Sequence, residues 1–413
     1  MGTSEIITII IVLTAVFAYI NHRLIKWPPT IGIMVLSLSA SILLAVLGEY
    51  NPLFSDKAIK FAASINFQDV LMNFMLSFLL FAGAIHIDAD KLKRERWPIL
   101  VLSTIGIVLS TTIVGGVTWL LFQAFHLPVQ FIYCLLFGAL ISPTDPIAVL
   151  AILKKANIPA TLELKISGES LFNDGVAVVV FVTLMDVARS GASAFDVLVV
   201  GKLFLQEAIG GMLFGALLGY IGYYALRSID DYKVEILVTL AIVMGGYSIA
   251  GYLHISGPLA MVVAGIITGN KVKDEILSHI SRDYLVKFWE LIDEILNAVL
   301  FLLIGLELLT IKVNATVLLI GAISISVVMM ARWVSVYFPI LLLRYKIKFE
   351  KHAVAILTWG GLRGGLSVAL ALSLSPEMHR DEFLLITYMV VVFSILVQGL
   401  TIGSFTKRLL SKA

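Results

Sequence analysis

Long apolar runs, separated by short polar connections, recur along this entire sequence. A helix that crosses a lipid bilayer needs about 20 consecutive, mostly apolar residues, and most of these runs reach that length. Hydrophobic residues make up 59% of the chain and charged residues 14%, against about 45–50% and about 25% in soluble domains. A soluble core could not bury so much apolar surface. The sequence therefore predicts an all-α, polytopic membrane protein in contact with membrane lipids.

The apolar runs predict about 13 transmembrane helices. They are expected at residues 4–21, 30–48, 67–87, 97–125, 128–153, 164–188, 196–226, 233–253, 256–270, 284–309, 313–343, 351–374 and 382–406, with ends loose by a few residues. No soluble domain or low-complexity segment lies between them. Function should therefore reside within the membrane.

Basic residues are distributed unevenly between alternate connections. Of the 30 Lys and Arg residues, 22 fall in connections on one predicted side of the membrane and six on the other. Because Lys and Arg concentrate in cytoplasmic connections, we expect the N-terminus outside and the C-terminus in the cytoplasm. No basic segment precedes the first apolar run, which disfavours a cleaved signal peptide.

Charge and cysteine content exclude other classes of function. A net charge of +2 gives no support for a nucleic-acid partner. The only cysteine, Cys134, cannot form an intrachain disulfide, which disfavours redox chemistry and cysteine-bound metals.

Two predicted helices should be broken inside the membrane. The run at 128–153 contains the motif SPTDP at 142–146, and two prolines so close together interrupt a helix. The run at 351–374 contains GGLRGG at 360–365, where each glycine weakens the helix by about 1 kcal/mol relative to alanine. Irregular backbone at this depth is tolerated only where it is buried in protein or lines a cavity.

The two broken helices lie seven helices apart and run in opposite directions. This is expected if helices 1–6 and 8–13 form two inverted repeats joined by helix 7. Broken helices at matching positions of two repeats indicate the binding site of a transporter. Asp145 and Arg363 lie inside the breaks, so we expect the site where these breaks cross.

The helix at 164–188 carries a polar strip in apolar surroundings. Glu169 and Asn173 are four residues apart, as are Ser170 and Asp174, so all four share one face of the helix. Buried carboxylates are costly at this depth and indicate a functional site.

The first break should bring Thr144 and Asp145 beside this strip. Carboxylates, hydroxyls and backbone carbonyls are hard oxygen ligands that suit a small cation such as Na⁺. Two basic residues, Arg332 and Arg363, also lie at membrane depth and are the natural counter-ions for buried acids.

Three motifs carry a resemblance to a known family. GESLFNDGVAVVVF at 168–181, SPTDPIAV at 142–149 and WGGLRGG at 359–365 resemble the cation/proton antiporters of the NhaP type, which are related to animal sodium/proton exchangers. The likeness covers essentially the whole chain. It implies the NhaA-like antiporter fold, a homodimer in the inner membrane of a prokaryotic-type cell, and elevator-like movement of a six-helix core.

The resemblance also implies a division of the chain. Residues 1–96 and 228–310 would form mainly the dimerisation domain, 97–188 and 311–413 the two halves of the ion-translocation core, and 189–227 the linker helix.

The same resemblance implies roles for the cation-binding residues. Asp174 resembles the family's ion- and proton-binding aspartate. Asp145, Ser170 and Thr144 resemble its cation ligands. No cofactor is implied besides the transported Na⁺ and H⁺.

Four residues are expected to support this site. Asn173 occupies the position where electrogenic relatives carry a second aspartate, which implies electroneutral exchange of one cation for one proton. Glu169 resembles a glutamate that pairs with a membrane arginine. Arg332 is the first candidate for that partner and Arg363 is expected to stabilise the second break, but the sequence leaves their roles open.

Several alternatives remain at this stage. The cation could be Li⁺ or K⁺ instead of Na⁺, and a cation-coupled organic-anion symporter could use a similar fold. A channel would more simply use a pore helix or symmetric subunits. An intramembrane aspartyl protease, the enzyme alternative, would carry a Gly-x-Gly-Asp signature that this sequence lacks.

Overall fold

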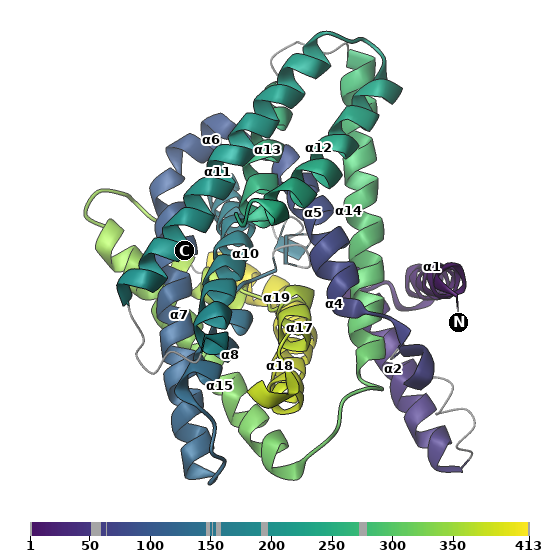
Figure 1. Cartoon of the computed structure of the whole chain (residues 1–413), viewed down its shortest axis with the longest axis vertical. Helices are drawn as coiled ribbons and strands as arrows, with labels where there is room; N and C mark the ends of the chain where they lie inside the picture. The colour runs from purple at the N-terminus through teal and green to yellow at the C-terminus, as the bar shows by residue number, and fades with distance from the viewer. Residues whose placement is uncertain are drawn as a thin grey trace.

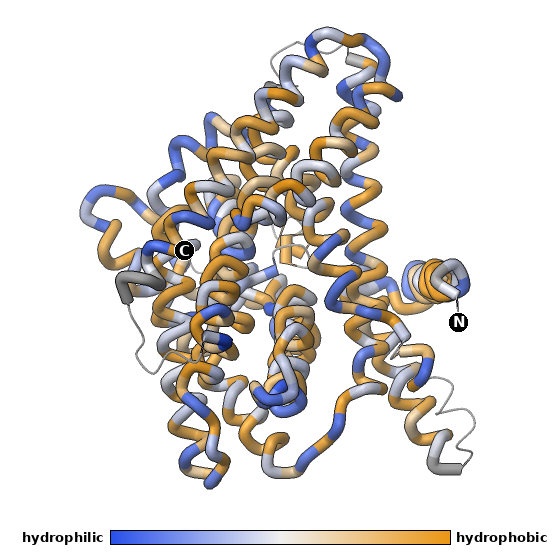
Figure 2. The backbone as a smooth tube through the Cα atoms, in the orientation of Figure 1, coloured by the Kyte–Doolittle hydropathy of each residue, from blue (hydrophilic) through white to orange (hydrophobic). Residues whose placement is uncertain are grey.

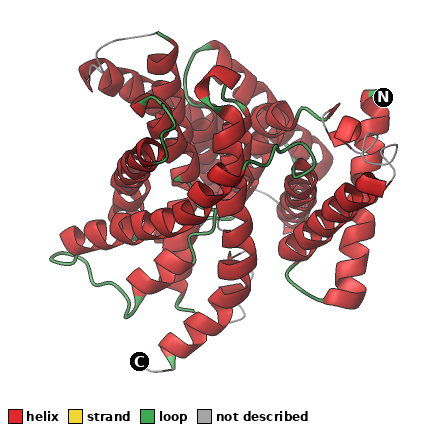
Figure 3. Ribbon diagram, turned by 90° about the horizontal axis from the view of Figure 1, so that it is seen from below, coloured by secondary structure: helices red, strands yellow, loops and turns green. Residues whose placement is uncertain are grey.

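The structure is a computed structural model that describes residues 2–50, 59–62, 64–145, 149–150, 152–153, 158–190, 197–271 and 279–411. Nearly all of these residues are helical, as Figure 3 shows, and a single backbone bridge is the only extended pairing among them. The prediction of an all-α protein is confirmed.

Helix occurs in each of the predicted apolar runs. The first half of the chain contains α1 (Thr3–Ile20), α2 (Pro29–Tyr50), α4 (Phe67–Val70), α5 (Leu76–Ile85), α6 (Ala89–Arg94), α7 (Arg96–Ala124), α8 (Phe131–Ile141) and α10 (Ala160–Arg189). The second half contains α11 (Val197–Arg227), α12 (Tyr232–Tyr252), α13 (Gly257–Lys271), α14 (His279–Glu307), α15 (Ala315–Leu343), α16 (Ala353–Trp359), α17 (Gly365–Leu372), α18 (Arg380–Phe393) and α19 (Leu400–Leu410). Within the described residues, nine helical segments are long and apolar enough to cross a membrane.

The outer surface of these helices is apolar. Figure 2 shows hydrophobic residues along most of the helix lengths, with hydrophilic residues gathered mainly at helix ends and connections. On α11, for example, Leu213 and Leu217 are 68% and 56% exposed. Water would penalise such a surface, whereas hydrocarbon does not. The molecule is therefore an integral membrane protein.

Both predicted helix breaks are present, and they meet. α8 ends at Ile141, and the second break separates α16 from α17 between Trp359 and Gly365. The Asp145 amide donates a 2.8 Å hydrogen bond to the Leu362 carbonyl in an antiparallel bridge. Pro146, the second proline of the predicted break, lies outside the described residues.

The helices pack into two groups that face each other (Figure 1). α7 packs against α8, α10 and α15, and α18 packs against α15 and α17, so these helices surround the two breaks. α14 packs against α2, α5 and α12, and α13 packs against α5 and α11. The crossing thus belongs to one group, and the long helix α14 lies in the other.

A buried ion cluster joins three elements at the end of the bundle where α10 begins. The ammonium of Lys165, 1% exposed, lies 2.8 Å from a carboxylate oxygen of Glu350 and 3.4 Å from one of Glu95. Burial raises the pKa of Glu350, but hydrogen bonds from Lys165 and Thr161 outweigh it and leave this pKa below its usual value. These contacts tie α10 to the residues that precede α7 and α16.

Small residues allow close helix packing where α11 meets α13. A Cβ atom on Gly215 would overlap the carbonyl oxygen of Ala260, and one on Gly211 would lie 2.5 Å from the carbonyl oxygen of Ser256. Small residues are the usual means by which membrane helices approach closely. Gly245 of α12, in contrast, faces open space.

We therefore expect Gly215→Ala to lower the free energy of unfolding by about 1–3 kcal/mol, because the added methyl group must push α11 and α13 apart. Gly245→Ala is the matched control and should be neutral or stabilising, since alanine favours helix by about 1 kcal/mol. Thermal unfolding of both variants in detergent would measure the difference. Equal unfolding temperatures would contradict this account of the packing.

Candidate functional site

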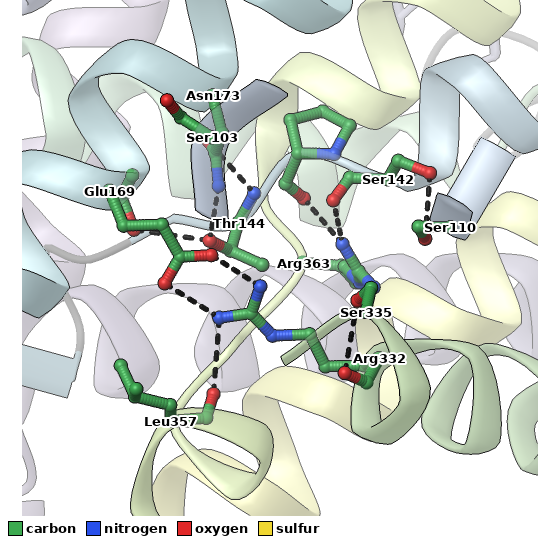
Figure 4. A network of polar contacts seen from close by, with 12 residues as sticks. Ser103, Ser110, Ser142, Thr144, Glu169, Asn173, Arg332, Ser335, Leu357 and Arg363 are labelled. Carbon is green, nitrogen blue, oxygen red and sulfur yellow. Dashed lines mark hydrogen bonds and ion pairs between the residues drawn. The ribbon is translucent and has the colours of Figure 1, made fainter. Parts of the chain in front are cut away.

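The polar strip of α10 lies against the first break, where it holds Thr144. The Asn173 side-chain amide donates a 2.8 Å hydrogen bond to the Thr144 hydroxyl, and the Thr144 backbone amide lies 3.4 Å from the Asn173 oxygen. The Ser170 hydroxyl lies 3.1 Å from that of Thr144. Figure 4 shows the contacts between Asn173 and Thr144. They fix the irregular backbone of the first break to α10 immediately beside Asp174.

Glycines of the second break allow it to pass close to the acidic site. A Cβ atom on Gly364 would lie 2.5 Å from a carboxylate oxygen of Asp145, and one on Gly361 would lie 2.5 Å from the Nε atom of Arg332. Any larger residue would have to displace these side chains. The glycines thus interrupt the helix and also let its backbone pass close to Asp145 and Arg332.

Glu169 pairs with Arg332 in the structure. The Arg332 guanidinium, on α15, binds both carboxylate oxygens of Glu169, one of them at 3.0 Å, and also donates a 3.1 Å hydrogen bond to the Leu357 carbonyl (Figure 4). Glu169 is 1% exposed and Arg332 is 6% exposed. The pair links α10 to α15 and to α16 at the second break.

Arg363 reaches across to the other break. Its guanidinium donates to the carbonyls of Ser142 and Pro143, the latter at 3.0 Å, while its backbone amide donates a 3.0 Å hydrogen bond to the hydroxyl of Ser394. The sequence led us to expect that Arg363 stabilises its own break. Its side chain instead satisfies the carbonyls that end α8, because the crossing places them within its reach.

Each arginine at membrane depth is thereby committed to a partner other than Asp174. Among the described residues, neither Arg332 nor Arg363 forms an ion pair with Asp174. This carboxylate is partly exposed and lines a cavity, so it can bind an ion that enters from there.

The cavity has a volume of about 780 Å³. Thr144, Asp145 and Asp174 lie in its wall at the crossing, together with Gly364. The other predicted site residues, Ser170, Asn173, Glu169, Arg332 and Arg363, do not line it. The structure thus separates groups that face the cavity from groups that hold them in position.

The cavity wall also contains acids that sequence analysis missed. α14 contributes three acids, Glu290, Asp293 and Glu294, and also Asn297. Their spacing of three and four residues puts them on one face of a helix, and this polar stripe inside an apolar run was the available signal. The sequence did not show which other helix the stripe faces.

Removal of one partner of the buried ion pair should be costly. Glu169→Gln leaves the Arg332 guanidinium buried without its counter-ion, and we expect a loss of about 3–5 kcal/mol in the free energy of unfolding. The control Asp283→Asn breaks a solvent-exposed ion pair with Lys287, and the loss of such a surface pair should change stability far less. Thermal unfolding in detergent would compare them. Similar losses would show that the buried pair is not a structural support.

Comparison with known proteins shows the family to which the chain belongs. The family model of the transmembrane sodium/hydrogen exchangers matches residues 11–408. The Na⁺/H⁺ antiporter NhaP of Pseudomonas aeruginosa is 48% identical over 98% of this chain and 96% of its own length, and the Na⁺/H⁺ antiporter NhaH of Halobacillus dabanensis is 34% identical over 94% and 93%.

The fold is likewise similar to that of a solved structure. The sodium/proton antiporter MjNhaP1 from Methanocaldococcus jannaschii matches with a TM-score of 0.75 at 20% sequence identity, over 98% of this chain and 97% of that one. The predicted NhaP-type resemblance is therefore confirmed. The chain belongs to the transmembrane sodium/hydrogen exchanger family.

Proposed function

We propose that this protein is a secondary antiporter that exchanges Na⁺ for H⁺ across the membrane. One observation carries the proposal: two carboxylates, Asp145 and Asp174, line a cavity where two broken helices cross, while both arginines at that depth are bound elsewhere. Relatives named as Na⁺/H⁺ antiporters, over almost the full length of the chain, give independent support.

Asp174 is the group for which cation and proton compete. Burial in a medium of low polarity penalises its empty, charged form. A bound proton or a bound Na⁺ neutralises the carboxylate, so the loaded forms cross at lower cost than the empty one. This difference couples the two fluxes. Asp145 and the Thr144 hydroxyl supply further oxygen ligands, and Ser170 positions Thr144 through its 3.1 Å contact.

Exchange is electroneutral, one cation for one proton. Asn173 is neutral, and its amide is used in the contacts with Thr144. Within the polar strip at 169–174, Asp174 is thus the carboxylate that is available to a proton, because Glu169 is held by Arg332.

Alternating access arises from movement of one helix group against the other. The group with both breaks corresponds to the core formed by residues 97–188 and 311–413, and the group with α14 to the dimerisation domain of residues 1–96 and 228–310. The two halves of the core would be inverted repeats, and two copies would associate as a homodimer. Binding of the ion within one group, at the edge of the other, favours an elevator-like displacement.

The described conformation is open towards the cytoplasm. The cavity extends from Asp174 to Asp88 and Lys91, near the connection between α5 and α7. The positive-inside rule puts this connection in the cytoplasm, with the N-terminus outside.

The lining of the cavity favours a cation over an organic anion. Among the described residues, seven acidic side chains and one lysine face it. An organic-anion symporter would need donors or basic groups at the substrate site, whereas Lys91 lies at the far end of the cavity from Asp174. Among alkali cations we favour Na⁺ because hard oxygen ligands cluster tightly at the crossing; K⁺ is the runner-up.

Asp174→Asn should abolish exchange, because an amide neither binds a proton nor neutralises Na⁺. The measurement is recovery of a pH-dye signal in proteoliposomes after Na⁺ addition, with Asp283→Asn as a control that retains exchange. Proton-coupled Na⁺ flux in Asp174→Asn would rule out this mechanism.

The apparent KM for Na⁺ should rise as pH falls, by up to about tenfold per pH unit where the proton dominates, because one proton displaces one cation. Initial rates across a pH series would give KM and maximal rate separately. A KM that does not change with pH would argue against a shared site.

Exchange should proceed without charge movement. A potassium ionophore that clamps the membrane potential should leave the Na⁺-driven rate unchanged. An increased rate under the clamp would show net charge transfer and refute the one-for-one exchange.

A further inference from the structure

α14 forms part of the cavity wall, and the mechanism above makes no use of its polar residues. Glu290 and Glu294 are exposed, whereas Asp293 is partly buried and Asn297 is 2% exposed. All four line the cavity. The two glutamates are exposed, but the inner pair is arranged differently.

Asn297 has an unpartnered oxygen. Its side-chain nitrogen donates to the Asp293 backbone carbonyl at 2.8 Å and to an Asp293 carboxylate oxygen at 3.1 Å. Its side-chain oxygen has no hydrogen-bond partner among the described residues. A buried acceptor without a partner costs about 1–3 kcal/mol, and such a group calls for a ligand.

Asp293 and Asn297 thus combine a carboxylate with an amide oxygen beside one cavity. The hydrogen bond from the Asn297 nitrogen orients the Asp293 carboxylate and leaves both residues with acceptor capacity. Carboxylate and amide oxygens are hard ligands that suit a small cation. Nothing in this pair favours an anion.

This pair lies close to the crossing. A Cβ atom on Gly365 would overlap the side chain of Leu300, which follows Asn297 by less than one helical turn. α14 therefore contacts the start of α17 at Gly365, directly after Gly364, which packs against Asp145. Asp293 and Asp145 are near enough to interact electrostatically. Two like charges facing one cavity are stabilised by a cation between them.

We propose that Asp293 and Asn297 form an accessory binding site for the transported monovalent cation. This proposal rests on the proposed function. The site holds a cation on the fixed wall of the cavity and supplies it to Asp174 and Asp145 on the moving wall. It raises the local cation concentration without taking part in the proton exchange.

Soaking crystals with Tl⁺, a heavy monovalent cation, tests the proposal directly. We expect two anomalous peaks per protomer, one beside Asp174 and one beside Asp293. Asp293→Asn should lose only the second peak and Asp174→Asn only the first. A single peak beside Asp174 in the unaltered protein, or retention of the second peak in Asp293→Asn, would overturn the accessory site. Absence of the first peak would instead contradict the proposed function.

Transport kinetics give a second test with a matched control. Asp293→Asn and Asn297→Leu should each raise the KM for Na⁺ by about tenfold, which corresponds to loss of about 1.4 kcal/mol of binding, while the maximal rate stays within about twofold. Glu290→Gln removes a negative charge from the same wall and should change KM by less than about twofold. Equal changes in all three variants would show diffuse attraction and exclude a defined site.

Discussion

The crossing of two interrupted helices is the constraint on which the rest of the structure depends. Each break exposes backbone donors and acceptors at membrane depth, where lipid offers no hydrogen-bond partner for them. Here each break supplies partners for the other: the Asp145 amide binds the Leu362 carbonyl, and the Arg363 guanidinium binds the carbonyls that end α8. Neither break would be tolerable alone. The crossing is therefore both a structural requirement and the place where ion ligands can be exposed.

Charge pairing at this crossing decides which acid remains reactive. Three acids, Asp145, Glu169 and Asp174, and two arginines, Arg332 and Arg363, lie at the crossing. If each arginine paired with an acid, a single carboxylate would remain. Glu169 takes Arg332 in a bidentate contact, and Arg363 is used by backbone carbonyls. Asp174 is left facing the cavity. Because both arginines are bound to other partners, neither neutralises Asp174.

The two helix groups contribute different polar residues to the cavity. The group with the breaks holds Asp145 and Asp174, and the buried cluster of Lys165, Glu95 and Glu350 ties its elements together at one end. α14 in the other group presents Asp293 and Asn297 across the cavity. A cation in the cavity therefore meets oxygen atoms on both walls, and relative displacement of the walls would change which of them it contacts.

Much of this organisation was determined by the sequence. Hydropathy alone predicted a helical membrane protein. Prolines at 143 and 146 and four glycines within 360–365 predicted two breaks, because closely spaced prolines remove backbone donors and clustered glycines weaken a helix. Spacing of four put Glu169, Asn173, Ser170 and Asp174 on one face. These are local properties of the chain, and the structure shows both breaks and the shared face.

Only the tertiary structure determined which residues pair with Glu169 and Arg363. Which arginine binds Glu169, and that Arg363 serves the opposite break, depends on how α15 and the second break pack on α10. The spacing of residues along the sequence does not predict these contacts. The acids of α14 were visible as a stripe, but only the fold put them across a cavity from Asp174. Helix period fixes which side chains share a face, whereas the contact between faces distant in sequence depends on packing of the whole bundle.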